Sequence, residues 1–151
     1  MKPGGANPGP FYLVWLAPFK AGVSPEQWPY QIAAIAQSAA LDKRYPQLLP
    51  GAGADDAARR GMQIYMANCA ACHKLGGAGD AAVGPDLNQP YNPTEYFQEP
   101  FLRKLIRDPA SVRNWGGRAM PGFAPDALSE ANLDDLIAYL RQMARQRGQK
   151  P

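Results

Sequence analysis

Two cysteines and one histidine stand together in the stretch Cys69-Ala70-Ala71-Cys72-His73, and the chain holds no other cysteine or histidine. Two thiols separated by two residues can bond to two substituents on one edge of a porphyrin. The histidine that follows them is carried beneath the ring, where its nitrogen can bind iron. This pattern is the attachment signature of a covalent c-type haem. The residues therefore predict one haem with a single histidine ligand and exclude a pair of histidine ligands.

The same cysteines have other interpretations. A dithiol redox motif requires a thioredoxin-like strand and helix around it, and the flanking sequence lacks that pattern. A structural zinc site needs a fourth ligand, and the chain has no further cysteine or histidine to supply it. Haem attachment is therefore favoured over a non-haem dithiol module and over two cysteines without a shared role.

A methionine in a downstream loop is the predicted ligand on the other face of the iron. A thioether suits haem iron once a second histidine is excluded. Met120 is far enough from His73 along the chain to reach that face, and Pro121 stiffens the chain beside it. The remaining methionines after Met1 are interpreted as packing side chains, because they belong to predicted helices: Met62, Met66 and Met143.

Composition bounds the class of protein. The 151 residues suit one ordinary domain, or a small domain with an extension, and the 46% of hydrophobic residues exclude wholesale disorder. A net charge of +3 with scattered basic residues does not indicate nucleic-acid binding. The longest apolar run, residues 11–16, is far too short to span a membrane. No segment has the layout of a signal peptide, so an exported protein would here be represented by its mature form or by a piece.

Two helices should frame the cysteine-histidine motif. One is predicted from Asp55 or Asp56, whose carboxylates suit the positive end of a helix, into Cys69. The other is predicted from its N-cap Ser129 to about residue 147. It has one apolar face, made by residues at helical spacing: Leu133, Leu136, Ile137 and Leu140.

A third, shorter helix is predicted over residues 100–107, with Pro109 ending or bending it. Its basic residues are interpreted as a solvated helix face rather than a patch that steers a partner: Arg103, Lys104 and Arg107. The stretches 74–99 and 111–128 should be mostly loop. Loops of that length usually have a functional reason, and a buried cofactor supplies one.

Residues 55–147 resemble a class I cytochrome c. Gly61, Tyr65 and Cys69 stand at successive four-residue steps, as in the first helix of that family. The resemblance implies that the glycine permits a close crossing by the last helix, whose aromatic residue would be Tyr139. It also implies a mainly α, loop-rich haem domain that transfers single electrons.

The stretch Gly84-Pro85-Asp86-Leu87 matches the turn that follows the haem motif in that family. The resemblance implies that the carbonyl of Pro85 accepts the second N–H of His73 and that Leu87 packs on the haem. An acceptor of this kind fixes the orientation of a ligating imidazole.

Met120 with the following proline matches the distal ligand loop of the same family. The resemblance implies haem contacts from two residues that precede it. Trp115 and Arg118 would hydrogen-bond or pair with a haem propionate, since an arginine suits a carboxylate and a tryptophan has one donor. The interpretation of these two as a packing tryptophan and a surface arginine is equally open.

The first part of the chain does not match a minimal cytochrome. Residues 1–54 are predicted to be an extension and linker, with the linker over 46–54, and residues 55–151 to be the haem domain. Strand formers at residues 11–16 favour a small β element in the extension. Residues 9–15 and 26–32 weakly resemble the closing strands of sulfite-oxidase-type molybdopterin-binding domains.

These observations predict an electron carrier with His73 and Met120 on the iron, not an enzyme. By resemblance it would be exported, to the periplasm or elsewhere, and would serve a larger dehydrogenase, including a molybdenum-containing one, or an oxidase. Two alternatives stay open. One is a haem enzyme or gas sensor in which Met120 is absent from the iron or displaceable, and the other is the non-haem dithiol module.

Overall fold

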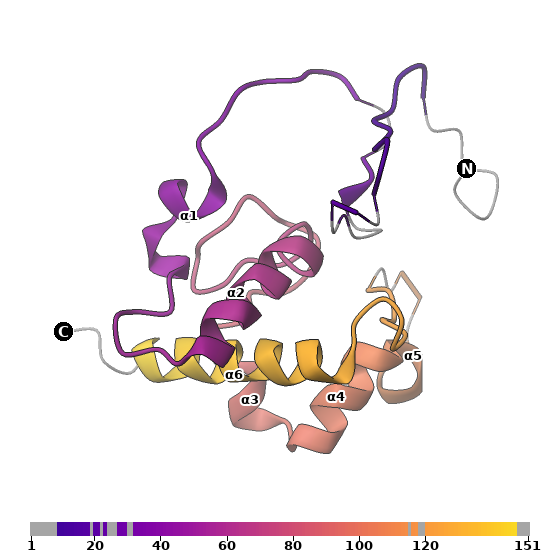
Figure 1. Cartoon of the computed structure of the whole chain (residues 1–151). Coiled ribbons are helices and arrows are strands. Elements are labelled where there is room, and N and C mark those ends of the chain that lie inside the picture. The colour runs from indigo at the N-terminus through magenta and orange to yellow at the C-terminus, as the bar shows by residue number, and fades with distance from the viewer. Residues whose placement is uncertain are drawn as a thin grey trace.

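The computed structural model describes residues 9–18, 20–21, 23, 27–29, 32–114, 116–117 and 120–147. The mainly α, loop-rich fold predicted from the sequence is confirmed (Figure 1). No strand occurs in the described part of the chain, so the small β element expected in the extension is not found there. The elements follow one another as α1 (Leu41–Arg44), the short 3-10 helix η2 (Pro46–Leu48), α2 (Asp56–Asn68), α3 (Pro93–Tyr96), α4 (Glu99–Arg107), α5 (Pro109–Val112) and α6 (Glu130–Arg147).

Helix α2 begins where the acidic pair predicted it. The carboxylate of Asp55 accepts a hydrogen bond from the backbone N–H of Ala58 at 2.8 Å, which satisfies one of the N–H groups left over at a helix start. The buried side of the helix carries Ala58, Gly61 and Tyr65, at three- and four-residue spacing. The helix ends at Asn68, so the cysteine-histidine motif starts directly at its C-terminal end.

Helix α6 also lies where it was predicted, with Ser129 at its start. The Ser129 hydroxyl accepts a hydrogen bond from the N–H of Asn132 at 3.2 Å. The predicted apolar face is buried and forms much of the core. The buried residues of this helix are Leu133, Asp135, Leu136, Ile137, Tyr139, Leu140 and Met143.

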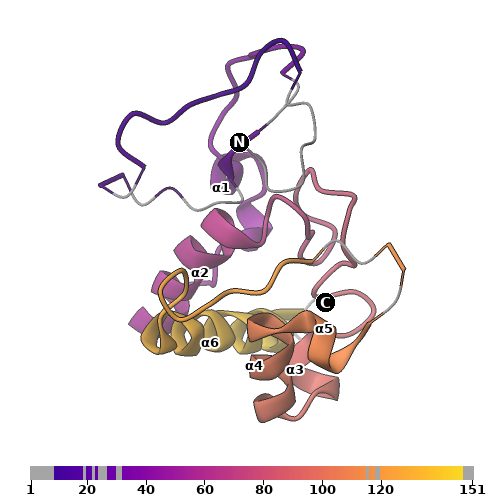
Figure 2. The ribbon, with the colours of Figure 1, turned by 90° about the vertical axis from the view of Figure 1, so that its right-hand side faces the viewer.

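Helices α2 and α6 cross at Gly61, and both views of the molecule show the crossing (Figures 1 and 2). A Cβ atom on Gly61 would lie 2.7 Å from the Cβ of Tyr139 and closer still to the carbonyl oxygen of Asp135. The predicted close contact is therefore confirmed, because no side chain fits there. Beside the contact, the Arg60 guanidinium donates to both carboxylate oxygens of Asp135 at 2.7 and 2.8 Å.

The three short helices α3, α4 and α5 lie on the side of α6 away from α2 (Figures 1 and 2). Helix α4 ends at Arg107 and α5 starts at Pro109, as the proline predicted. Helix α3 was not predicted. It begins with a capping box, in which Asn92 and Glu95 bind each other's backbone N–H groups.

The solvated face proposed for α4 is wrong for two of its three basic residues. Arg103 pairs with Glu99 on its own helix and with Asp134 on α6 at 2.5 Å. Arg107 pairs with Glu130, the first residue of α6, at 2.7 Å. Sequence patterns did not show this, because the acidic partners on α6 are distant in the chain. Lys104 is exposed, as expected.

Residues 41–50 pack against the hydrophobic core and against α6. Leu48 is wholly buried, and its carbonyl accepts a hydrogen bond from the Tyr139 hydroxyl at 2.8 Å. The carbonyl of Pro50 accepts from the Gln142 side chain at 3.0 Å. A linker over residues 46–54 would not have a buried leucine, so part of this stretch belongs to the core. The domain boundary after residue 54 stays a prediction.

The described residues before α1 form an extended arm (Figure 1). Leu16 is 100% exposed and Ile35 is 86% exposed, so the arm leaves large apolar side chains in water. Within the arm, Trp15 donates its indole N–H to the carbonyl of Gln27 at 3.0 Å. Across the described residues, every helix falls short of what a bilayer crossing requires.

Candidate cofactor site

A cavity of about 330 Å³ lies between the end of α2, the loops that follow it, and the apolar face of α6. Its wall is mostly apolar, with a few polar groups among the apolar side chains, which is typical of cofactor sites. The lining residues are Asn68, Cys69, Cys72, His73, Val83, Gly84, Pro85, Leu87, Pro93, Tyr96, Phe97, Leu102, Leu105, Ile106, Pro109, Arg113, Gly117, Met120, Pro121, Phe123, Leu128, Leu136 and Leu140.

Both cysteines and the histidine reach this cavity because the chain turns tightly after α2. The carbonyl of Cys69 accepts hydrogen bonds from the N–H groups of Cys72 at 3.0 Å and His73 at 2.9 Å. The turn thus repeats a helical spacing and brings all three side chains to one wall. The Tyr65 hydroxyl, buried within α2, donates to the carbonyl of His73 at 2.8 Å and ties the turn back to the helix.

The loop that follows His73 holds the histidine ring through a backbone carbonyl. Its Nδ1 lies 2.7 Å from the carbonyl oxygen of Pro85. A carbonyl can only accept, so Nδ1 carries the hydrogen and Nε2 keeps its lone pair for a metal. Gly84 makes this approach possible, because a Cβ there would lie 2.6 Å from the Nδ1 of His73.

Asp86 fixes the turn that contains this acceptor carbonyl. One carboxylate oxygen accepts from the N–H of Gly76 at 2.8 Å and from that of Asn88 at 2.7 Å. The other accepts from the N–H of Gly77 at 2.6 Å. The carboxylate therefore joins the segment just after His73 to the residue that follows the turn, Asn88.

Met120 also lines the cavity, half-buried and packed against the core. Among the methionines in the described residues, it is the one that reaches this wall. Met62 and Met66 pack on the core from α2, and Met143 is buried in α6, as the sequence predicted.

The loop that carries Met120 is anchored to α4. The Arg107 guanidinium donates to the carbonyl of Phe123 at 2.9 Å and to that of Leu128. The N–H of Phe123 donates in turn to the carbonyl of Ile106 at 3.1 Å. Trp115 and Arg118, the predicted propionate contacts, lie outside the described residues.

The cavity contains few ionisable groups. Burial raises the pKa of Tyr65 and that of Tyr139, two neighbouring phenols behind the motif, whose ring centroids are 5.7 Å apart with the planes tilted by 45°. Burial likewise raises the pKa of Tyr96 at the cavity wall, and the nearby charge of Arg113 partly offsets the rise. The phenols therefore stay neutral even well above ordinary pH and add no charge near the cavity.

Comparison with known families matches residues 58–144 to cytochrome c. This is more than half of the chain, and it contains the whole cavity wall. The chain belongs to the cytochrome c family. The family implies covalently bound haem c and electron transfer through it, which agrees with the chemistry of the cavity.

The match begins after the N-terminal arm, and no curated protein matches the chain. The resemblance of the extension to sulfite-oxidase-type domains is therefore not supported. The strand formers on which it rested occupy an arm without strands in its described residues.

Several residues of this cytochrome's site were not anticipated from the sequence. Asp86 and Arg107 hold the two loops, and the buried amides of Asn88 and Asn92 support the wall. The capping box at Asn92 was a usable signal for α3. The other contacts carried none, because their partners are distant along the chain.

Proposed function

We propose that this chain carries single electrons on one haem c, which Cys69 and Cys72 would hold through thioether bonds and whose iron His73 and Met120 would bind. One observation carries the proposal. A single apolar cavity gathers both cysteines, the one histidine of the chain and, of the described methionines, Met120 alone. The count of one haem is supported by the single attachment motif.

When bound, the haem supplies an iron that cycles between Fe(III) and Fe(II). The protein orients the ligands and excludes water. His73 presents Nε2 because its Nδ1–H is held by the carbonyl of Pro85. Leu87 and the other apolar wall residues exclude water, which limits the reorganisation of solvent when the iron changes charge. Met120 from the second loop would complete the iron's coordination, and a full set of ligands leaves no position for oxygen or peroxide.

The donor and acceptor are proposed to be protein partners, a larger dehydrogenase or an oxidase. The exposed apolar side chains of the arm support a protein partner, because apolar groups gathered in water often mark interaction sites. Attachment of haem c supports an exported protein, with the periplasm as the proposed location.

The deciding experiment is an absorption spectrum of the oxidised and reduced protein, with a near-infrared scan for iron–thioether ligation. The wild-type protein should show a covalent haem, one per chain, and the thioether band. Cys69→Ser combined with Cys72→Ser should lose covalent haem. Haem that stays with this variant after acid-acetone extraction contradicts the proposal.

The role of Met120 is tested with matched methionine variants. Met120→Ala should abolish the thioether band and let the reduced protein bind carbon monoxide, and Met120→His should lower the potential by about 0.1 V or more. Met62→Leu, Met66→Leu and Met143→Leu should leave the band in place. Rapid carbon monoxide binding by the wild-type protein would instead indicate the gas sensor or haem enzyme.

A further inference from the structure

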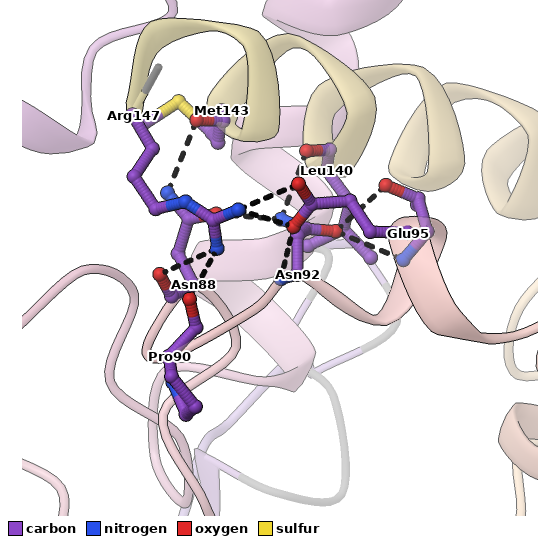
Figure 3. A network of polar contacts seen from close by, with 8 residues as sticks. Asn88, Pro90, Asn92, Glu95, Leu140, Met143 and Arg147 are labelled. Carbon is purple, nitrogen blue, oxygen red and sulfur yellow. Dashed lines mark hydrogen bonds and ion pairs between the residues drawn. The ribbon is translucent and has the colours of Figure 1, made fainter.

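Two asparagines on the loop after the histidine are buried in the core, although asparagine is usually found at the surface. Asn88 is 5% exposed and Asn92 is 0% exposed. Figure 3 shows both side chains pointing at the C-terminal half of α6. Asn88 donates its amide N–H to the carbonyl of Met143 and Asn92 donates to that of Leu140, each at 3.0 Å.

The hydrogen-bonding capacity of Asn92 is fully used. Its second amide N–H goes to the side-chain oxygen of Asn88 at 3.0 Å. Its own oxygen accepts from the N–H and the hydroxyl of Thr94 at 3.0 and 2.8 Å. A buried side chain with every donor and acceptor satisfied is held in one arrangement, because breaking any of its bonds leaves a polar group without a partner.

An ion pair between Arg147 and Glu95 covers the outer side of the network (Figure 3). Arg147, the last residue of α6, donates to the carbonyl of Pro90 at 2.7 Å and pairs with Glu95 at 2.5 Å. Glu95 accepts from the backbone N–H of Asn92 at 2.6 Å. The loop is thus attached to α6 through both its side chains and its backbone.

The same hydrogen bonds lead back to the histidine. The backbone N–H of Asn88 donates to Asp86 at 2.7 Å, and Asp86 follows directly after Pro85, whose carbonyl lies 2.7 Å from His73 Nδ1. Pro93 and Phe97, which come after Asn92, line the cavity. Asn88 and Asn92 therefore connect the Pro85 carbonyl, and the part of the cavity wall formed by Pro93 and Phe97, to α6.

We propose that Asn88 and Asn92 are positioning residues that set the reduction potential by holding the Pro85 carbonyl on His73. The proposal rests on the proposed function, since it needs a haem iron on His73. A carbonyl that accepts Nδ1–H makes the imidazole a stronger electron donor, which favours Fe(III). Releasing that carbonyl should therefore raise the potential.

The test compares variants of the holoprotein. Asn92→Ala removes the core of the network, and Tyr139→Phe is the matched control, because it removes a buried hydrogen bond to Leu48 on the far side of α6. Both variants should melt at a lower temperature. Only Asn92→Ala should lower the Fe(III):Fe(II) ratio at a fixed applied potential. About threefold is expected, or about 28 mV upward at about 59 mV per tenfold change. The His73 ring N–H should shift in the proton NMR spectrum of that variant alone.

Each outcome decides the matter. Equal potentials and an unmoved ring N–H in both variants would reduce the network to a purely structural one and overturn the proposal. A potential that falls in Asn92→Ala, with the ring N–H unmoved, would point to water entry and overturn it too. If Asn92→Ala does not fold, Arg147→Gln removes only the outer contacts and should give a smaller rise. A wild-type protein without covalent haem would instead overturn the proposed function itself.

Discussion

Two loops line the cavity, and they are held in different ways. The first runs from His73 to Asn92, and the second from Arg113 to Leu128. The first is held by side chains of its own, Asp86, Asn88 and Asn92, which bind backbone groups in the loop and in α6. In the described part of the second, the loop offers backbone carbonyls and the holding side chain, Arg107, comes from α4.

This difference teaches where sequence change is tolerated. A loop held by its own side chains depends on those residues, and a substitution there moves the histidine's support directly. A loop held through its backbone depends on its path. Its exposed side chains can vary around Met120, whereas Phe123 and Leu128 are buried in the core. Sequence changes in the first loop should therefore affect the iron more often than changes in the second.

The largest expected effect comes from one methyl group added to the first loop, with the same change in the second loop as its control. Gly84→Ala would place its Cβ 2.6 Å from the Nδ1 of His73 and should displace the imidazole, so the variant should mature poorly or lose its normal low-spin spectrum. Gly116→Ala in the second loop meets no described atom within 4 Å and should mature with an unchanged spectrum. The comparison breaks if the two variants behave alike in haem yield and absorption.

Shortening the chain should destabilise the domain as a whole rather than one loop, because it removes packing against the core helix α6. A protein that starts at Gly53 lacks Leu48, which is wholly buried against α6, and should lose roughly 2–5 kcal/mol of unfolding free energy. A protein that starts at Ala40 keeps it and should be close to the full chain. Both should keep the full-length spectrum once matured. Denaturant unfolding followed by circular dichroism measures the difference, and equal midpoints would show that Leu48 contributes nothing.

The second loop should respond to the loss of its anchor. Arg107→Gln removes charged donors from the carbonyls of Phe123 and Leu128 and should destabilise the protein by roughly 1–3 kcal/mol. It should also weaken the thioether band and speed carbon monoxide binding, because Met120 is then less firmly placed. Arg103→Gln, which loses ion pairs on the same helix but no loop contact, is the control. Identical ligand-binding rates in the two variants would contradict the anchor.

The smallest effect concerns pH. Hydrogen bonds from Arg103 and Arg141 hold the pKa of Glu99 below its ordinary value of 4.5. A lowered pKa in the folded state means that Glu99 stabilises the link between α4 and α6 above that value. The contribution is lost as the pH falls through the folded-state pKa. Melting temperatures of the wild type and Glu99→Gln should therefore converge in acid, and a constant gap across pH would refute this.

Sequence reasoning reached the parts of the fold that local signals determine. The start of α2 at Asp55, the apolar face of α6 and the crossing at Gly61 follow from caps and spacing, which act within a few turns of helix. The gathering of Cys69 and His73 in one cavity follows from their adjacency.

The remainder depends on contacts between distant residues. Asn88 and Asn92 sit among prolines and were assigned to loop, yet their partners Met143 and Leu140 lie on the last helix. Leu48 stands in a Pro- and Gly-rich stretch, and only the folded chain brings Tyr139 to it. No periodicity connects such pairs, so their burial could not be predicted from either segment alone.

The cavity also has a consequence for how this protein is made. A mostly apolar hollow that meets water in place of a cofactor costs free energy, because its wall loses the packing that the porphyrin would supply. The net stability of a small domain is only about 5–15 kcal/mol, so such a cost matters. A newly made chain should therefore remain incompletely folded and sensitive to proteases until the haem is attached. Biogenesis and folding would then be one event, and the machinery that joins thiol to vinyl would meet an open chain rather than a finished domain.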